Sequence, residues 1–162
     1  MRMLVLLALF FSFHAHGAPA TSKAPSGPRA FGFTDSSNFL TGQSASALFG
    51  GDTDWIHVML SVNRTLGTFE FGVGGIYKFT VAGDRRAGFH VGPGVSVGTV
   101  AVGAKSEFGF GIAGVAGGHW TLFDRLIVSV DGGPALGVVD GNANFSLKPL
   151  GEILGLSLHY LF

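Results

Sequence analysis

The sequence lacks cysteine, has little charge and contains only one long hydrophobic run. Without cysteine, neither a disulfide framework nor a lipoprotein anchor is possible. Only 12% of the residues are charged, against roughly 25% in soluble domains. The ten basic and ten acidic residues form no run of either sign, which argues against a nucleic-acid-binding surface. After residue 13, no stretch approaches the roughly 20 apolar residues of a membrane-spanning helix.

The hydrophobic run lies at the start of the chain and resembles a secretory signal. Residues 4–13 are apolar and follow Met1-Arg2-Met3, as in a basic n-region and an apolar h-region. Small residues allow cleavage after Gly17 or after Ala20. We therefore expect a signal peptide at 1–20, a small, polar and proline-rich linker without fixed structure at 21–29, and one domain at 30–162.

Residues 30–162 contain short stretches in which large apolar residues alternate with small or polar ones. This period of two is typical of β-strands. Eight strands are predicted, at about 30–35, 44–50, 55–63, 68–81, 87–100, 107–123, 126–138 and 145–162. Tight charged connections alternate with connections richer in asparagine, serine and glycine. The expected fold is all-β, an eight-stranded antiparallel up-and-down barrel with both termini at the end that carries the tight connections.

The composition of the two strand faces favours a membrane. In 154–162, Leu154, Leu156, Leu158, Tyr160 and Phe162 alternate with glycine, serine and histidine. A soluble barrel would place charged residues outside, whereas the second face here is mostly glycine, serine, threonine and histidine. The chain has 27 glycines, and many of those within the strands lie on the small-residue face, which suits the inner face of a narrow barrel. We therefore expect a transmembrane barrel with its large residues facing lipid and its small ones facing the lumen.

Two further features accompany the strands. Pro93 and Pro134 lie within strands on the large-residue face, and a bulge is predicted at each because proline lacks a backbone donor. Aromatic residues near both strand ends predict partial girdles at the membrane surfaces. The residues are Tyr77, Phe79, Trp120, Tyr160 and Phe162 at the tight-turn end, and Phe69, Phe71, Phe108 and Phe110 at the other.

The signal peptide, the short alternating strands and the pattern Leu154-x-Leu156-x-Leu158-x-Tyr160-x-Phe162 resemble the small outer-membrane β-barrels of Gram-negative bacteria, the OmpA/OmpX-like eight-stranded group. The resemblance implies a cell outer membrane location with periplasmic termini and contacts with outer-membrane lipid. It also implies that the barrel-assembly machinery reads Leu158, Tyr160 and Phe162 as a C-terminal assembly signal. The connections, all under about ten residues, are shorter than the long extracellular loops common in that group.

Charged and histidine side chains gather on the small-residue face. The residues are His57, Glu70, Lys78, His90, Glu107, His119, Asp131 and His159. Charges in a narrow lumen must pair or draw in water, so we expect a structural polar network that plugs the barrel. A metal site is the alternative, although no HxH or HExxH spacing supports it. We expect no catalytic residue, cofactor or resident metal.

The expected role is that of a structural or interaction protein, monomeric and without nucleic-acid or porin function. Two alternatives stay open. The first is a membrane-embedded lipid hydrolase similar to the lipid A deacylases, whose His-x-Ser-Asn signature is missing here. The second is a soluble lipocalin-like barrel that binds an apolar ligand.

Overall fold

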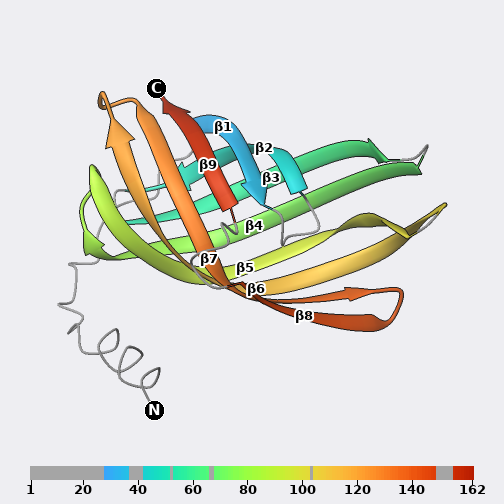
Figure 1. Ribbon diagram of the computed structural model, residues 1–162. Coiled ribbons are helices and arrows are strands. Elements are labelled where there is room, and N and C mark those ends of the chain that lie inside the picture. Colours follow the sequence, from blue (N-terminus) through green and yellow to red (C-terminus); the bar gives the residue numbers. More distant parts are fainter. Residues whose placement is uncertain (1–27, 37–41, 52, 66–67, 103, 149–154) are drawn as a thin grey trace, which may run out of the picture.

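The structure, a computed structural model, describes residues 28–36, 42–51, 53–65, 68–102, 104–148 and 155–162. The predicted signal peptide and most of the predicted linker lie outside these residues. These residues form nine strands: β1 Pro28–Ser36, β2 Gly42–Gly50, β3 Asp54–Thr65, β4 Thr68–Gly83, β5 Ala87–Val102, β6 Lys105–Leu122, β7 Leu126–Val139, β8 Asn142–Lys148 and β9 Gly155–Leu161 (Figure 1). In the described part of the chain, no helix is long and apolar enough to cross a membrane.

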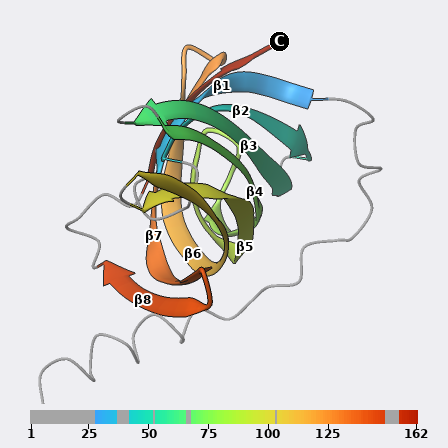
Figure 2. The same cartoon turned by 90° about the vertical axis from the view of Figure 1, so that its right-hand side faces the viewer.

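The strands form one closed antiparallel barrel. Each strand from β1 to β6 pairs with the next strand in sequence. β9 pairs with both β7 and β1, which closes the sheet. β8 pairs with β7 at the other end of that strand. Thus β8 and β9 together take the place of the predicted eighth strand, and residues 149–154 between them lie outside the described residues. The prediction of an eight-stranded antiparallel barrel is confirmed, and its last strand is divided (Figure 2).

The tight turns lie together at one end of the barrel. The turns Asp84–Arg86, between β4 and β5, and Phe123–Arg125, between β6 and β7, lie near the C-terminus in Figure 1. Phe123 and Asp124 both have left-handed backbone conformations, with φ of 52° and 56°, which let the chain reverse in three residues. The turn between β7 and β8 lies at the opposite end. It is shorter than the connection expected between the predicted strands at 126–138 and 145–162, because β8 already begins at Asn142.

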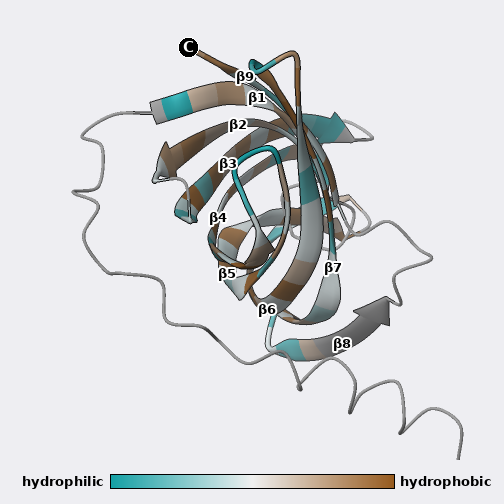
Figure 3. Cartoon of the chain, turned by 90° about the vertical axis from the view of Figure 1, so that its left-hand side faces the viewer, coloured by the Kyte–Doolittle hydropathy of each residue, from teal (hydrophilic) through white to brown (hydrophobic). Residues whose placement is uncertain are grey.

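Large apolar residues point out of the barrel, and small or polar residues point into it. Along β4, exposed Phe71, Val73, Tyr77 and Phe79 alternate with buried residues that include Lys78. Hydrophobic and paler residues also alternate along the strands in Figure 3. The predicted assignment of the two faces in the β3–β7 region is therefore confirmed for these strands.

The predicted bulges at the two prolines are wrong. The β4–β5 register is the same on both sides of Pro93, with Ile76 opposite Gly94 and Phe79 opposite Val91. The β6–β7 register is likewise unchanged across Pro134. The missing donor is accommodated by a local gap in the ladder, because no extra residue is needed to remove one hydrogen bond. The register shifts instead between Thr80 and Ala82.

The first strand begins earlier than predicted. β1 starts at Pro28, so Pro28 and Arg29, which were assigned to the linker, belong to the strand. Pro28 is tolerated there because proline is compatible with the first residue of a strand. The alternation that predicts a strand starts only at Ala30, where the side chains begin to differ in size, and composition alone therefore places the boundary two residues late.

Candidate functional site

Four of the predicted lumenal residues come together inside the barrel as one cluster of ionisable side chains. Lys78 extends from β4, His90 from β5, His119 from β6 and Asp131 from β7. The side chains of Lys78, His90 and His119 are almost completely buried, and Asp131 is 6% exposed. Charges this deeply buried require partners, since each one left unpaired costs several kcal/mol.

The Asp131 carboxylate provides those partners. Lys78 Nζ donates to its Oδ2 at 2.6 Å, and His90 Nε2 lies 2.5 Å from its Oδ1. The other ring nitrogen of His90 lies 3.5 Å from Nδ1 of His119. His119 Nε2 in turn donates to the carbonyl oxygen of Asp84 at 3.0 Å, because that carbonyl can only accept. The cluster therefore connects four strands to the turn between β4 and β5.

A glycine makes the His90–Asp131 contact possible. Gly117 of β6 lies between the two residues in the sheet, opposite His90 on one side and Asp131 on the other. A Cβ on Gly117 would lie 2.6 Å from Asp131 Oδ1 and 2.9 Å from His90 Nε2, and 2.2 Å from the Val130 carbonyl oxygen. Any side chain here would occupy the space of the hydrogen bond.

His57 and His159 form a second cluster with hydroxyl groups of β1, β2 and β9. Thr34 Oγ1 lies 2.9 Å from His57 Nε2 and 3.0 Å from Ser46 Oγ, and it donates to Ser157 Oγ at 3.1 Å. Ser46 Oγ also lies 2.8 Å from His159 Nε2. The two imidazole rings meet edge to face with centroids 4.9 Å apart. All five side chains are buried.

The direction of these hydrogen bonds shows what the second cluster can do. Each hydroxyl has a single proton, so Thr34, which donates to Ser157, must accept from Ser46, and Ser46 must accept from His159. His159 Nε2 is therefore the donor in the hydrogen bond with Ser46. A general base would instead accept the hydroxyl proton of a nucleophilic serine. His159 Nδ1 also has no hydrogen-bond partner in the described part of the chain, so no carboxylate completes a triad.

The two predicted glutamates do not join either cluster. Glu70 lies near the start of β4. Its Oε1 accepts from the backbone nitrogen of Ala101 at 2.6 Å and its Oε2 from Asn63 Nδ2 at 3.4 Å. Glu107 lies near the start of β6, opposite Val100. The structure thus brings together six of the eight predicted lumenal residues, in two groups, and leaves Glu70 and Glu107 near the end opposite the tight turns.

The three residues of the predicted C-terminal assembly signal lie on the outer face. Leu158, Tyr160 and Phe162 are each at least 47% exposed. The Tyr160 hydroxyl accepts from Arg125 Nη1 at 2.8 Å. The ring centroids of Phe162 and Phe31 lie 5.5 Å apart. Their use as an assembly signal stays a prediction.

Several residues of the clusters are not among those predicted from sequence. Thr34 and Ser46 lie on β1 and β2, where the alternation is too short to separate the two faces. Trp55 lies on the same face of β3 as His57, and this spacing would have placed it inside. Its ring packs edge to face on that of His119, with centroids 4.7 Å apart. Gly117 has no sequence signal, since its role depends on two neighbouring strands.

The described residues contain no group of three or more histidine, aspartate or glutamate side chains arranged to hold a metal ion. Comparison of the chain with protein-family models, with curated proteins and with solved structures finds no match.

Proposed function

We propose that this chain is an integral β-barrel of a bacterial outer membrane, similar to the OmpA/OmpX-like group, with its termini and tight turns on the periplasmic side. Its lumen is filled by side chains. It acts as a structural or interaction protein and has no catalytic role.

The distribution of apolar side chains carries this proposal. Twenty-seven large hydrophobic side chains are exposed among the described residues, and nine hydrophobic residues are buried. Soluble monomers rarely expose contiguous apolar patches above a few hundred Å². Moving one large apolar side chain from water into hydrocarbon contributes about 1.5–3 kcal/mol. A lipid environment therefore turns the outer face from a large cost into the main source of stability.

The same distribution opposes a lipocalin-like barrel. A soluble barrel that binds an apolar ligand needs a hydrophobic cavity and a polar exterior. Here the largest completely buried side chains are Lys78, Met59 and the four barrel histidines, so the interior offers mainly polar groups. The closed barrel also suits hydrocarbon, because an open sheet edge would leave unpaired backbone groups there, each at a cost of several kcal/mol.

The ion pair and hydrogen bonds that cross the lumen support a plugged barrel. Lys78 and Asp131 meet from β4 and β7, which are not neighbours in the sheet. In an eight-stranded barrel the interior is only wide enough for side chains. We expect the purified protein to form no ion-conducting channel in planar bilayers. Stable conductance steps at the level of a general porin would contradict the plugged lumen.

The absence of cysteine makes a direct test of the membrane location practical. Val95 of β5 points outward and is 60% exposed, whereas Ala104 lies in the turn between β5 and β6. Each is replaced by cysteine in an otherwise cysteine-free chain, and a nitroxide spin label is attached. The label at position 95 should collide mainly with oxygen, which concentrates in hydrocarbon, and the label at position 104 mainly with a water-soluble nickel complex.

Fractionation of cells that express the full chain accompanies this experiment. We expect the protein in the outer-membrane fraction, with gel migration in detergent that changes on heating. A mature chain that stays soluble and monomeric without detergent would overturn the proposal, as would a label at position 95 that the nickel complex reaches as readily as the label at position 104.

A further inference from the structure

The two tyrosines of the chain lie on the outer face of the barrel, toward the end that carries the tight turns. Tyr77 of β4 is 43% exposed, and Tyr160 of β9 is 48% exposed. Their hydroxyl groups have opposite partners. The Tyr77 hydroxyl donates its proton to Asp54 Oδ2 at 3.1 Å, whereas the Tyr160 hydroxyl accepts from Arg125 Nη1 at 2.8 Å. The Tyr77 proton is therefore engaged, and the Tyr160 proton has no acceptor among the described residues.

Arg125 also has hydrogen-bond donors that are not engaged. Its bond to Tyr160 uses one of several guanidinium N–H groups. Among the described residues, Arg125 forms no ion pair with a carboxylate. The neighbouring Asp124 lies 3.6 Å from the Arg86 guanidinium. The Arg125 backbone is fixed to β9, because its carbonyl oxygen accepts from the Leu161 nitrogen at 2.7 Å. Arg125 and Tyr160 can therefore offer a positive charge and an O–H donor to one ligand.

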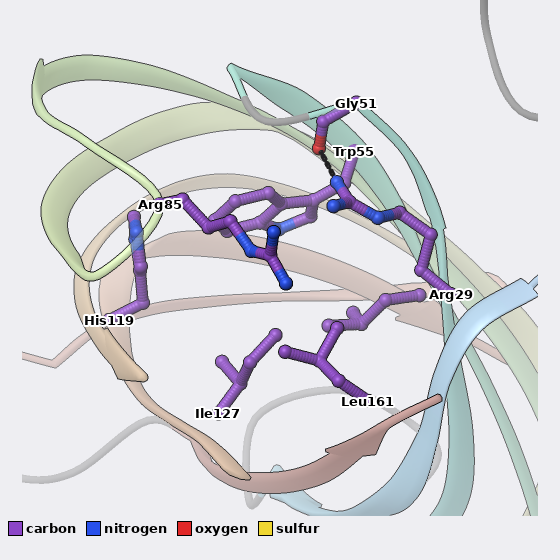
Figure 4. A pocket seen from close by; sticks show the side chains of 8 residues that line it. Arg29, Gly51, Trp55, Arg85, His119, Ile127 and Leu161 are labelled. Carbon is purple, nitrogen blue, oxygen red and sulfur yellow. Dashed lines mark hydrogen bonds between the residues drawn. The ribbon is translucent and has the colours of Figure 1, made fainter. Parts of the chain in front are cut away.

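This pair lies on the outer side of the barrel rim. Leu161 and Arg85 line a small recess over the open end of the barrel (Figure 4). Leu161 is 8% exposed, and successive side chains of a strand point to opposite faces, so the neighbouring Tyr160 points outward. Its hydroxyl group holds the Arg125 guanidinium on that side. Arg85 and Arg125 thus belong to the same end of the barrel but face different surroundings.

An apolar strip begins beside Tyr160 on the outer face. Leu158 and Leu156 follow at every second position of β9, and each is 47% exposed. Phe33 of β1 and Val128 of β7 lie opposite Leu158 on its two sides. The outer face therefore places a cationic hydrogen-bonding pair at one end of a hydrocarbon surface. This arrangement matches the polarity of an amphiphile with an anionic headgroup.

We propose that Arg125 and Tyr160 bind the phosphate group of a phospholipid whose acyl chains lie along the outer face of β9. The phosphate oxygens accept from the guanidinium and from the phenol hydroxyl. The tyrosine ring lies at the depth of the headgroups, where amphipathic rings are favoured. At Tyr77, the Asp54 carboxylate repels phosphate, so only one of the two tyrosines favours such a headgroup. This inference rests on the proposed membrane location and adds a defined lipid position to it.

Native mass spectrometry of the full chain measures the bound lipid. The protein is folded in uncharged maltoside micelles and titrated with dimyristoyl phosphatidylglycerol. Dimyristoylglycerol, which lacks the phosphate, tests the acyl chains alone, and glycerol phosphate tests the headgroup alone. We expect saturable binding of a single phosphatidylglycerol molecule and much weaker binding of both control compounds. Either control compound binding as tightly as phosphatidylglycerol would overturn the proposal.

Two matched pairs of variants locate the site. Arg125→Gln should weaken phosphatidylglycerol binding about fivefold, which corresponds to about 1 kcal/mol, the upper value for exposed ion pairs. Arg85→Gln removes the same charge from the same end and should weaken binding less than about twofold, because solvent and salt screen a more distant charge. Tyr160→Phe should weaken binding about threefold through one lost hydrogen bond, and Tyr77→Phe should leave it unchanged. Equal losses within either pair would overturn the site.

The spin-label experiment separates this inference from the membrane proposal. If oxygen reaches the label at position 95 and the wild-type protein binds no phosphatidylglycerol, only the lipid site is refuted. If the nickel complex reaches that label, the membrane location itself is refuted. Heat-modifiable migration first shows that each variant is folded, so that weaker binding reports on the site. The tyrosine pair decides alone where an arginine variant does not fold.

Discussion

Lys78 Nζ on β4 lies 2.6 Å from Asp131 Oδ2 on β7, and this ion pair joins two strands that are separated in the sheet by β5 and β6. Because both side chains are almost fully buried, water cannot take the place of either partner. Removing one residue of the pair leaves the other buried without its ion-pair partner, which costs about 3–5 kcal/mol, whereas replacing both by apolar residues of similar volume is often close to neutral.

We therefore expect Lys78→Met to destabilise the barrel by about 3–5 kcal/mol, and the double variant Lys78→Met/Asp131→Leu to recover part of that loss. His90 limits the recovery, because it also loses its carboxylate partner. Urea unfolding in detergent micelles, followed by the gel migration of unheated samples, measures the free energies. Arg86→Gln, which removes an exposed ion pair, serves as the control and should cost less than about 1 kcal/mol. Additive effects of the two lumenal substitutions would show that the residues do not interact.

The part of this site that sequence predicts is the set of side chains that face inward. Alternation along β4 places Lys78 inside, and the same argument places His90, His119 and Asp131 inside. Which of them meet depends on the registers of β5 with β6 and of β6 with β7, and those registers come from the whole sheet. Gly117 illustrates the limit: it looks like any strand glycine until both neighbouring strands are placed.

The division of the last strand has a similar origin. Residues 145–162 alternate well enough to predict one strand, but the pairing partners change along it. Asn142–Lys148 pairs with β7 alone, whereas Gly155–Leu161 pairs with β7 and β1. Local alternation indicates which residues lie on each face of a strand. It does not indicate which strands pair along its two edges. The bulges predicted at Pro93 and Pro134 failed for a related reason, since one missing donor does not require an extra residue.

Gly117 provides a second prediction. Gly117→Ala should strongly reduce the folded fraction, because the new methyl group would lie 2.2 Å from the Val130 carbonyl oxygen and would occupy the His90–Asp131 hydrogen bond. Gly75→Ala is the matched control, since the nearest atom to its Cβ is the His57 carbonyl oxygen at 4.0 Å. Refolding into detergent micelles, scored by heat-modifiable migration, compares the two variants. Equal refolded fractions of the two variants would mean that the sheet adjusts around position 117 without loss of stability.

A third prediction concerns pH and the turn between β4 and β5. Hydrogen bonds from the backbone nitrogens of Arg86 and Ala87 hold the pKa of Asp84 below its usual range. A carboxyl with a depressed folded pKa stabilises the protein above its unfolded pKa, about 3.9, and loses this contribution as the pH falls through the folded value. Wild type should therefore be more stable than Asp84→Asn at neutral pH, and the difference should shrink below about pH 4.

Unfolding of the two proteins across this pH range tests the turn. The amide that replaces the carboxylate in Asp84→Asn retains an oxygen that accepts hydrogen bonds, so the comparison isolates the charge. Asp124→Asn provides a control in the turn between β6 and β7, where the carboxylate is 77% exposed and lies 3.6 Å from the Arg86 guanidinium. A difference between wild type and Asp84→Asn that is independent of pH would contradict the role of the charge.

The C-terminal aromatic residues provide the last prediction. Replacing Tyr160 and Phe162 with aspartate should leave the chain exported but poorly assembled in the outer membrane, since the aromatic outer face of β9 is proposed to be read during assembly. Both residues also contribute contacts of their own. Phe162 donates its backbone N–H to the Arg29 carbonyl oxygen at 3.3 Å and contacts Phe31, and Tyr160 binds Arg125.

Two measurements separate assembly from packing. The first is the level of folded protein in the outer membrane of growing cells, and the second is spontaneous refolding of purified chain into detergent micelles. Recognition by the assembly machinery requires a large loss in cells with refolding largely retained, because only the first process involves that machinery. Arg125→Gln removes the hydrogen bond to Tyr160 and keeps both aromatic rings; it should leave the level in cells close to that of wild type. Normal outer-membrane levels of the aspartate variant would refute the assembly signal, and equal losses in both measurements would assign the effect to packing.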